Sequence, residues 1–317
     1  MAIDVKLQEL ITQRNNLADN LNTMGVEASQ EETLTTLVPK VLDIPSGGNS
    51  EITKGLVINE CDSNGYATDI SIVGMTNIPN YYLASNLNNP TYLGNISNVK
   101  IPEGVTKIGI SAFLYCKQLK TLKLPSSITT IDRYAFQASG LKTFEIPTAV
   151  KTIPEGVFYG CDNLTTINLH DDITDIGSSV FKNCSNLILT KLPDNLTSIG
   201  SAAFSGCKKI TSLNLPSGVT KLDSMIFINC SALAEMTCYG AITSISTSVF
   251  ANCTNLKKIV LPNITSVPTL SNWNAFNNTG ISNKTGYIYV PDDLVASFQS
   301  ASNWSTYASQ IKGVSEL

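Results

Sequence analysis

Seven phenylalanines recur along the chain at intervals of 23, 22, 23, 23, 23 and 23 residues. They are Phe113, Phe136, Phe158, Phe181, Phe204, Phe227 and Phe250. A period of this length is typical of a stacked repeat architecture, in which each unit buries its apolar side against its neighbours. Such a stack offers an extended surface, whereas an enzyme concentrates its chemistry in one cleft. The period therefore favours a binding protein.

The segment FLYCKQLKTLKLPSSITTIDRYAF, which begins at Phe113, contains one whole repeat. Leu119, Leu122 and Leu124 are spaced three and two residues apart, which predicts a turn followed by a short strand with alternate side chains inward. Pro125 ends that strand because it has no N–H for a ladder bond. The predicted inward pairs are Leu122/Leu124, Phe144/Ile146, Ile167/Leu169, Thr190/Leu192, Leu213/Leu215, Met236/Cys238 and Ile259/Leu261.

Two divergent turns extend this series. Ile96, Val99 and Ile101 fit it upstream, and Ile288 and Val290 fit it downstream. We therefore expect about nine turns of 22–23 residues. With parallel strands about 4.8 Å apart, the stack is expected to be roughly 40 Å long.

The leucine strand followed by Pro, the T-x-I segment and the A-F-x-x-C corner resemble the BspA-like (treponemal-type) leucine-rich repeats over about residues 66–291. This resemblance implies a right-handed leucine-rich repeat solenoid with a parallel β-sheet on its concave side. It also implies a surface or interaction protein and no catalytic residues.

Most of the eight cysteines follow the repeat. Six stand three residues after a repeat phenylalanine: Cys116, Cys161, Cys184, Cys207, Cys230 and Cys253. Ser139 takes that place in the remaining turn, and Cys238 replaces an inward leucine, so we expect small buried side chains with reduced thiols. Zinc sites need paired spacings such as C-x-x-C, and none occurs. The sequence thus predicts no metal site and no cofactor.

The chain carries no pattern that indicates an enzyme. His170 is the sole histidine and stands where other turns have proline, so we expect an exposed loop residue and no Ser-His-Asp triad. The acidic pair Asp171–Asp172 is typical of a turn, and Asp292–Asp293 of a helix start. No glycine-rich phosphate loop occurs.

The net charge limits the classes of partner that we expect for this chain. Charged residues make up 15% of the chain and the net charge is −4, which gives no general attraction to phosphate backbones or anionic lipids. No apolar run reaches membrane-spanning length, and the start of the sequence has no secretory h-region. We therefore expect no nucleic acid and no membrane as partner.

Residues 1–45 carry a different pattern. Apolar side chains are spaced 4 and 3 residues apart in turn, with Arg14 as one polar position. This heptad seam predicts a coiled coil or helical hairpin that oligomerises, and a helix packed on its own chain is the alternative. The seam residues are Ile3, Leu7, Leu10, Leu17, Leu21 and Met24. Residues 46–55 are predicted to be a flexible linker to the solenoid at 56–291.

The stretch from Leu10 to Ile44 also resembles short segments of tail-associated structural proteins from phages and prophages of Gram-positive bacteria. This resemblance implies a virion protein assembled in the host cytoplasm, of the receptor-binding or tail-fibre type. A bacterial cell-surface adhesin with the same repeats is the alternative.

Residues 292–317 are predicted to form a helical cap over the last turn, because an exposed solenoid end promotes aggregation. Leu294, Val295 and Phe298 fit a first helix. Trp304, Tyr307, Ala308 and Ile311 follow at i, i+3, i+4 and i+7 of an amphipathic helix.

Two rows of outward residues vary from turn to turn. The first contains Asn98, Thr121, Thr143, Thr166, Leu189, Ser212, Glu235, Lys258 and Tyr287. The second contains Lys100, Lys123, Glu145, Asn168, Lys191, Asn214, Thr237, Val260 and Tyr289. They form either a ligand surface or an ordinary solvated sheet. The candidate partner is a protein or glycan on a bacterial surface, or another tail protein. The candidate binding residues are Lys123, Glu145, Asn168, Lys191, Asn214, Thr237, Tyr239, Tyr287 and Tyr289.

Overall fold

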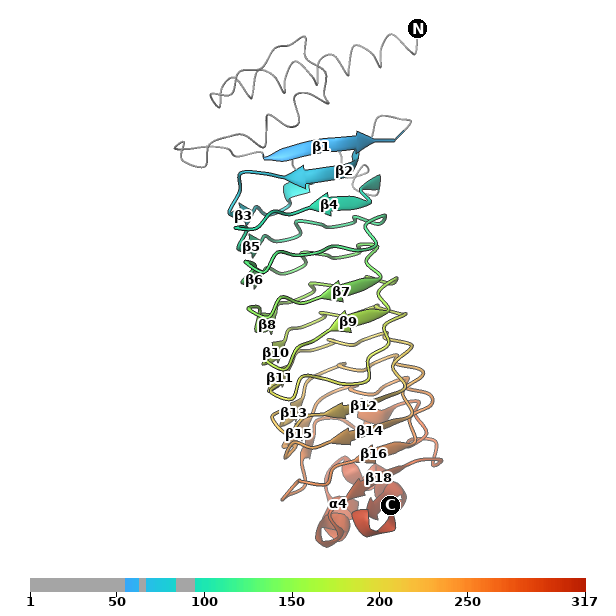
Figure 1. Cartoon of the computed structure of the whole chain (residues 1–317). Coiled ribbons are helices and arrows are strands. Elements are labelled where there is room, and N and C mark those ends of the chain that lie inside the picture. Colours follow the sequence, from blue (N-terminus) through green and yellow to red (C-terminus); the bar gives the residue numbers. More distant parts are fainter. Residues whose placement is uncertain (1–54, 63–66, 84–94) are drawn as a thin grey trace, which may run out of the picture.

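The computed structural model describes residues 55–62, 67–83 and 95–317, and these form a single stack of about nine turns (Figure 1). One side of the stack carries the first strand row, whose outward side chains we call the strand face. Its strands are β2 (Ala67–Ile72), β4 (Asn98–Lys100), β7 (Thr143–Glu145), β9 (Thr166–Asn168), β12 (Ser212–Leu215), β14 (Glu235–Cys238), β16 (Lys258–Val260), β18 (Tyr287–Val290) and β19 (Ile311–Gly313).

A second strand row lies along another side of the stack and comes from the T-x-I segments (Figure 1). Its strands are two residues long because a single inward Ile or Leu anchors each turn there. They are β3 (Asn77–Ile78), β5 (Lys107–Ile108), β6 (Thr130–Ile131), β8 (Thr152–Ile153), β10 (Asp175–Ile176), β11 (Ser198–Ile199), β13 (Lys221–Leu222), β15 (Ser244–Ile245) and β17 (Thr269–Leu270).

The strand register reproduces the sequence period. Along the first row, Ser212 pairs with Glu235, Glu235 with Lys258 and Lys258 with Tyr287, all in parallel. Equivalent positions of successive turns are thus neighbours in space, which confirms the predicted parallel solenoid.

The repeat phenylalanines form the centre of the core. From Phe113 to Phe276 each ring stacks on the next, with centroids 5.4 to 5.7 Å apart. All of these side chains are fully buried. Trp304 and Tyr307 contact Phe276 and close the end of the stack. The stacked repeat architecture that the phenylalanine period indicated is therefore confirmed.

Cysteines at the corners after the phenylalanines form hydrogen bonds to the neighbouring turn. In five successive turns, from Cys161 to Cys253, the thiol donates to the carbonyl oxygen of the phenylalanine one turn earlier, at 3.0 to 3.2 Å. Ser139 occupies the same place, is buried, and its Oγ lies 3.4 Å from Cys161 Sγ. The prediction that these thiols are buried and unpaired is confirmed.

The residue before each of these cysteines has a positive φ, which explains the asparagines there. Asn183, Asn229 and Asn252 have φ values of 62°, 63° and 63°, a conformation that asparagine tolerates better than most residues. Asn252 also donates through Nδ2 to Oδ1 of Asn229, at 2.9 Å. The recurring N-C-[ST] pattern is thus a consequence of backbone geometry.

One predicted inward pair is wrong. Thr190 is exposed, whereas Leu189, which the pattern placed outward, is buried with 7% of its surface exposed, and this turn contributes no strand to the first row. Burying a leucine is worth about 1.5–3 kcal/mol and burying a lone hydroxyl is unfavourable, so the turn adopts the register that covers Leu189. Val260, also placed outward, is buried as well.

The first turn begins with an antiparallel strand that the sequence pattern did not predict. β1 (Leu56–Cys61) pairs with β2 in the antiparallel direction, so that Leu56 lies opposite Ile72. β2 then pairs in parallel with β4. An antiparallel strand at this position covers the open edge of β2.

The C-terminal cap is only partly helical, which corrects the prediction for residues 292–317. It contains η3 (Asp292–Leu294), the short helix α4 (Val295–Ser300), η4 (Trp304–Gln310) and η5 (Val314–Glu316); η2 (Trp273–Phe276) precedes it in the last turn. Ile311, predicted to continue a helix, begins β19, which pairs in parallel with β18. A strand satisfies the unpaired backbone N–H and C=O groups at the edge of β18, whereas a helix packed over that edge would leave them without partners.

Candidate functional site

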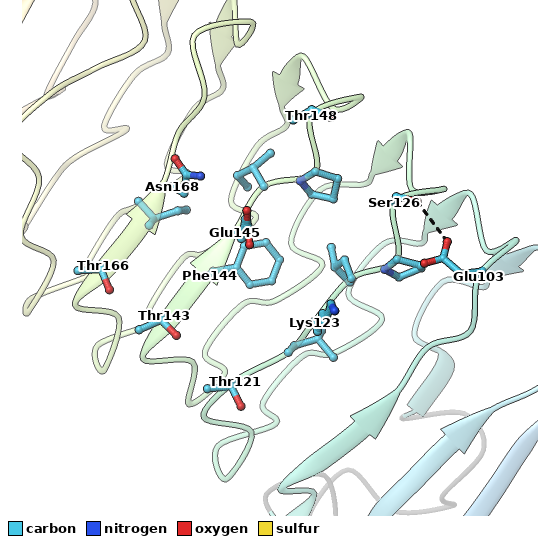
Figure 2. A pocket seen from close by; sticks show the side chains of 16 residues that line it. Glu103, Thr121, Lys123, Ser126, Thr143, Phe144, Glu145, Thr148, Thr166 and Asn168 are labelled. Carbon is cyan, nitrogen blue, oxygen red and sulfur yellow. Dashed lines mark hydrogen bonds between the residues drawn. The ribbon is translucent and has the colours of Figure 1, made fainter.

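The strand face is hollowed into a groove of about 1000 Å³ beside β7 and β9 (Figure 2). It lies along the first strand row over three successive turns. Among its lining residues are Lys123, Glu145 and Asn168, three of the predicted binding residues. The volume is at the upper end of the range usual for ligand sites.

One threonine from each of the three turns lines the groove: Thr121, Thr143 and Thr166 (Figure 2). Thr143 and Thr166 are direct partners in the β7–β9 register. All three are exposed, and their hydroxyls have no hydrogen-bond partner within the described part of the chain. Three free hydroxyls therefore form a row across the turns, about 4.8 Å apart.

The threonines that stand directly before the short strands of the second row differ in this respect. Thr197 Oγ1 donates to the carbonyl oxygen of Thr174 at 3.1 Å, and Thr243 Oγ1 donates to that of Thr220 at 3.1 Å. Their hydroxyls help to connect successive turns. The hydroxyls in the groove have no such structural role.

Lys123, Glu145 and Asn168 form a second row beside the threonines (Figure 2). Glu145 pairs with Asn168 in the strand register. Their side chains are exposed and, among the described residues, make no ion pair or hydrogen bond. The row offers an ammonium, a carboxylate and an amide to the same occupant. At the edge of the groove, Glu103 accepts a 3.4 Å hydrogen bond from Ser126.

Lys191 does not belong to this group. Its ammonium lies 3.0 Å from Asp194 Oδ2 and 3.4 Å from Asp171 Oδ1. The hydrogen bonds from Asp194 N–H and Lys191 lower the pKa of the Asp171 carboxyl. These groups are exposed, so the pairs contribute little to stability. Lys191 has local partners, whereas Lys123 is open to a ligand.

The predicted tyrosines lie at the other end of the strand face. Tyr287 and Tyr289 have ring centroids 6.3 Å apart, and Lys312 Nζ lies 4.7 Å from the Tyr287 centroid. Tyr239 is exposed two turns earlier, and within the described residues no ring contact joins it to them. Between the tyrosines and the groove, Asn214 and Thr237 pair in register. The structure thus brings three of the predicted residues together in the groove and two in a separate tyrosine pair, and Lys191, Asn214, Thr237 and Tyr239 belong to neither group.

Lys312 was missing from the predicted residues because the i, i+3, i+4, i+7 pattern favoured a helix there. β19 places it directly beside Tyr289. The short apolar-polar alternation of Ile311, Lys312 and Gly313 was the signal for a strand. The predicted oligomerisation residues, Ile3 to Met24, lie outside the described residues.

The buried thiols and the histidine stand apart from the groove. Burial raises the pKa of the Cys161 thiol to about 11 and that of Cys238 to about 12. His170, predicted to be exposed, is half-buried, and its Nε2 lies 3.2 Å from the carbonyl oxygen of Pro147. In the described ranges, no group of three or more His, Cys, Asp or Glu residues is arranged to hold a metal. No helix in these ranges is long and apolar enough to span a bilayer.

The family model of the BspA type leucine-rich repeat region matches residues 91–190 and 174–292, in six copies. This is more than half of the chain. The chain belongs to the BspA type leucine-rich repeat family. The corner with phenylalanine and cysteine and the leucine strand are therefore family features, whereas the side chains of the groove vary between its turns.

Solved structures with a similar fold come from several bacteria. A leucine-rich cell surface protein from Faecalibacterium prausnitzii is 22% identical, with 76% of each chain covered and a TM-score of 0.45. A leucine-rich repeat protein from T. pallidum is 21% identical over 66% of this chain and 91% of that one, with a TM-score of 0.40. The pneumococcal vaccine antigen PcpA is 17% identical over 80% of both chains, with a TM-score of 0.41.

These likenesses concern the stacked fold and do not identify a ligand. The comparison with curated proteins finds no match.

Proposed function

We propose that this chain is a non-enzymatic binding protein that recognises its partner through the strand face. The observation that carries the proposal is the groove with six polar side chains that make no hydrogen bond or ion pair in the part of the chain that the structure describes: Thr121, Lys123, Thr143, Glu145, Thr166 and Asn168. Thr197 and Thr243, which precede strands of the second row, bond to the neighbouring turn, whereas these six side chains face outward without such a bond. A free set of this size fits ligand recognition.

The finer assignment is a receptor-binding or tail-fibre type protein of a phage or prophage, located in the virion. Its support is the heptad seam of residues 3–24, which suits an oligomeric appendage, together with the resemblance of the N-terminal stretch to tail-associated proteins. A bacterial cell-surface adhesin is the alternative, since members of this repeat family are typically surface or interaction proteins. The two assignments can be told apart at the gene. Tail or baseplate genes beside it would support the virion protein, and an export signal in the full reading frame would support the cell-surface adhesin.

The binding face can be tested with the full chain biotinylated at Cys61, which is exposed while the other cysteines are buried. The labelled protein is applied to whole Gram-positive cells and to isolated cell walls. We expect Glu145→Arg and Asn168→Arg to reduce binding by adding bulk and charge to the groove. The matched control is Thr152→Arg, at an exposed position of β8. Equal binding of all three variants would refute the strand face as the binding surface.

A further inference from the structure

The chemistry of the groove defines the class of ligand, given the proposed binding function. Each of its three turns presents one free threonine hydroxyl and one further polar group, either Lys123, Glu145 or Asn168. A hydroxyl donates and accepts, a carboxylate accepts, an ammonium donates, and an amide does both. The occupant therefore needs closely spaced groups that both donate and accept, repeated about every 4.8 Å along the stack.

We propose that the groove binds a neutral linear glycan that runs along the solenoid axis across the turns. Successive sugar units then meet Thr121, Thr143 and Thr166 in order. Sugar hydroxyls donate and accept at once, and adjacent hydroxyls on a ring fit the two oxygens of Glu145 or the amide of Asn168. The repeat of an extended pyranose chain is close to the spacing of the turns.

The charges of the groove disfavour an acidic polymer. The lining contains one ammonium, from Lys123, and two carboxylates, from Glu103 and Glu145. A polyanion would face more negative than positive charge there, and the chain as a whole carries a net charge of −4. A neutral sugar chain avoids this repulsion.

The groove also lacks the anchors of a protein interface. Interface hot spots are enriched in tryptophan, tyrosine and arginine in desolvated pockets. None of these residue types lines the groove, and its one aromatic residue, Phe144, is buried with 5% of its surface exposed. The exposed tyrosines lie several turns away, in the pair Tyr287 and Tyr289.

The test is a titration of the full chain, with methyl-labelled threonines followed by NMR. The probes are neutral hexasaccharides of the cello-, malto-, xylo-, manno- and chito- series, with oligogalacturonate and a pool of unstructured decapeptides for comparison. We expect a neutral hexasaccharide to shift the methyl signals of Thr121, Thr143 and Thr166. The signals of Thr130 and Thr152, exposed on the second strand row, should not move.

Variants connect the shifts to the groove. Thr143→Val keeps the shape of the side chain and removes its hydroxyl, and Glu145→Gln removes the charge. Each should weaken hexasaccharide binding by about five-fold, as expected for the loss of one or two hydrogen bonds. Thr152→Val is the matched control and should leave the affinity unchanged.

The outcomes separate the two proposals. Groove shifts with the peptide pool or oligogalacturonate, and none with any neutral hexasaccharide, overturn the glycan inference and leave the binding function standing. No groove shift with any probe also overturns the glycan inference. Shifts in the hexasaccharide titration that fall outside the strand face, and that Thr143→Val does not alter, contradict both proposals.

Discussion

The thiol of Cys184 donates a hydrogen bond to the carbonyl oxygen of Phe158, 3.1 Å away and one turn earlier in the solenoid. The same bond recurs at the other corners from Cys161 to Cys253. A side chain common to the repeats thus satisfies a buried backbone carbonyl in the neighbouring turn. The recurring cysteine in the sequence therefore produces a recurring hydrogen bond between neighbouring turns.

The size of the Cys184 thiol and its hydrogen bond predict how its replacement changes the stability of the protein. Cys184→Ser resembles the natural Ser139 and keeps a donor, so we expect a loss of at most about 1 kcal/mol in the free energy of unfolding. Cys184→Leu overfills the corner and should cost about 1–3 kcal/mol. Chemical denaturation followed by circular dichroism measures both. Equal losses for the two variants would contradict this role of the thiol.

The buried thiols predict a stability that falls in alkaline solution. The ordinary thiol pKa is 9.0, and burial raises that of Cys161 to about 11 and that of Cys238 to about 12. Because the unfolded chain releases these protons first, the stabilising contribution is complete below pH 9 and is lost between about pH 9 and 12. In this range, each such thiol lowers the free energy of unfolding by roughly 1.4 kcal/mol per pH unit. Denaturation from pH 7 to 11 checks this, with Cys238→Ala expected to make the fall in stability less steep. A curve that is flat in the native protein contradicts the prediction.

The phenylalanine stack should be the main source of cohesion between turns. Phe204 is fully buried between Phe181 and Phe227, with centroids 5.4 and 5.5 Å away. Phe204→Ala leaves a cavity and should cost about 3–5 kcal/mol in the free energy of unfolding. Tyr287→Ala on the exposed strand face is the control and should cost far less. Similar losses for the two variants would show that the stack is not the core.

The turn with the altered register offers a direct test of the structure against the sequence pattern. In the structure Leu189 is buried and Thr190 is exposed, so Leu189→Thr should lower the free energy of unfolding by about 1.5–3 kcal/mol. Thr190→Ile should then give little change. If the sequence pattern were right, Thr190→Ile would stabilise the protein and Leu189→Thr would be neutral. Thermal and chemical unfolding of the two variants distinguishes these cases.

The heptad seam predicts an oligomer. We expect light scattering of the full chain to give a multiple of the 34.0 kDa chain mass. Leu10→Lys together with Leu17→Lys places charges in the seam and should yield a monomer. Substitution of Lys6 and Gln13 by Ala, at sequence positions outside the seam, is the control. A full chain that is monomeric with residues 1–50 present removes the oligomerisation hypothesis.

The fold was predictable because successive repeats carry the same residue types at the same core positions. Phe181, Cys184 and Leu187 are all fully buried at the places their spacing indicates. The candidate site was predictable only in part. Alternation along the strands placed Lys123, Glu145 and Asn168 outward, but it could not show that Lys191 has two carboxylate partners. Those partners come from loops whose course the pattern does not define.

The sequence by itself determined the architecture, because a 23-residue period of Phe, Cys and Leu can bury its apolar side only by stacking equivalent turns. Only the tertiary structure decided which polar side chains are free. Thr121 and Thr129 belong to the same repeat, yet Thr129 Oγ1 donates to the carbonyl of Thr106 and the hydroxyl of Thr121 faces the groove. The difference arises from the direction of each side chain relative to the next turn, a relation between distant segments that local spacing does not contain.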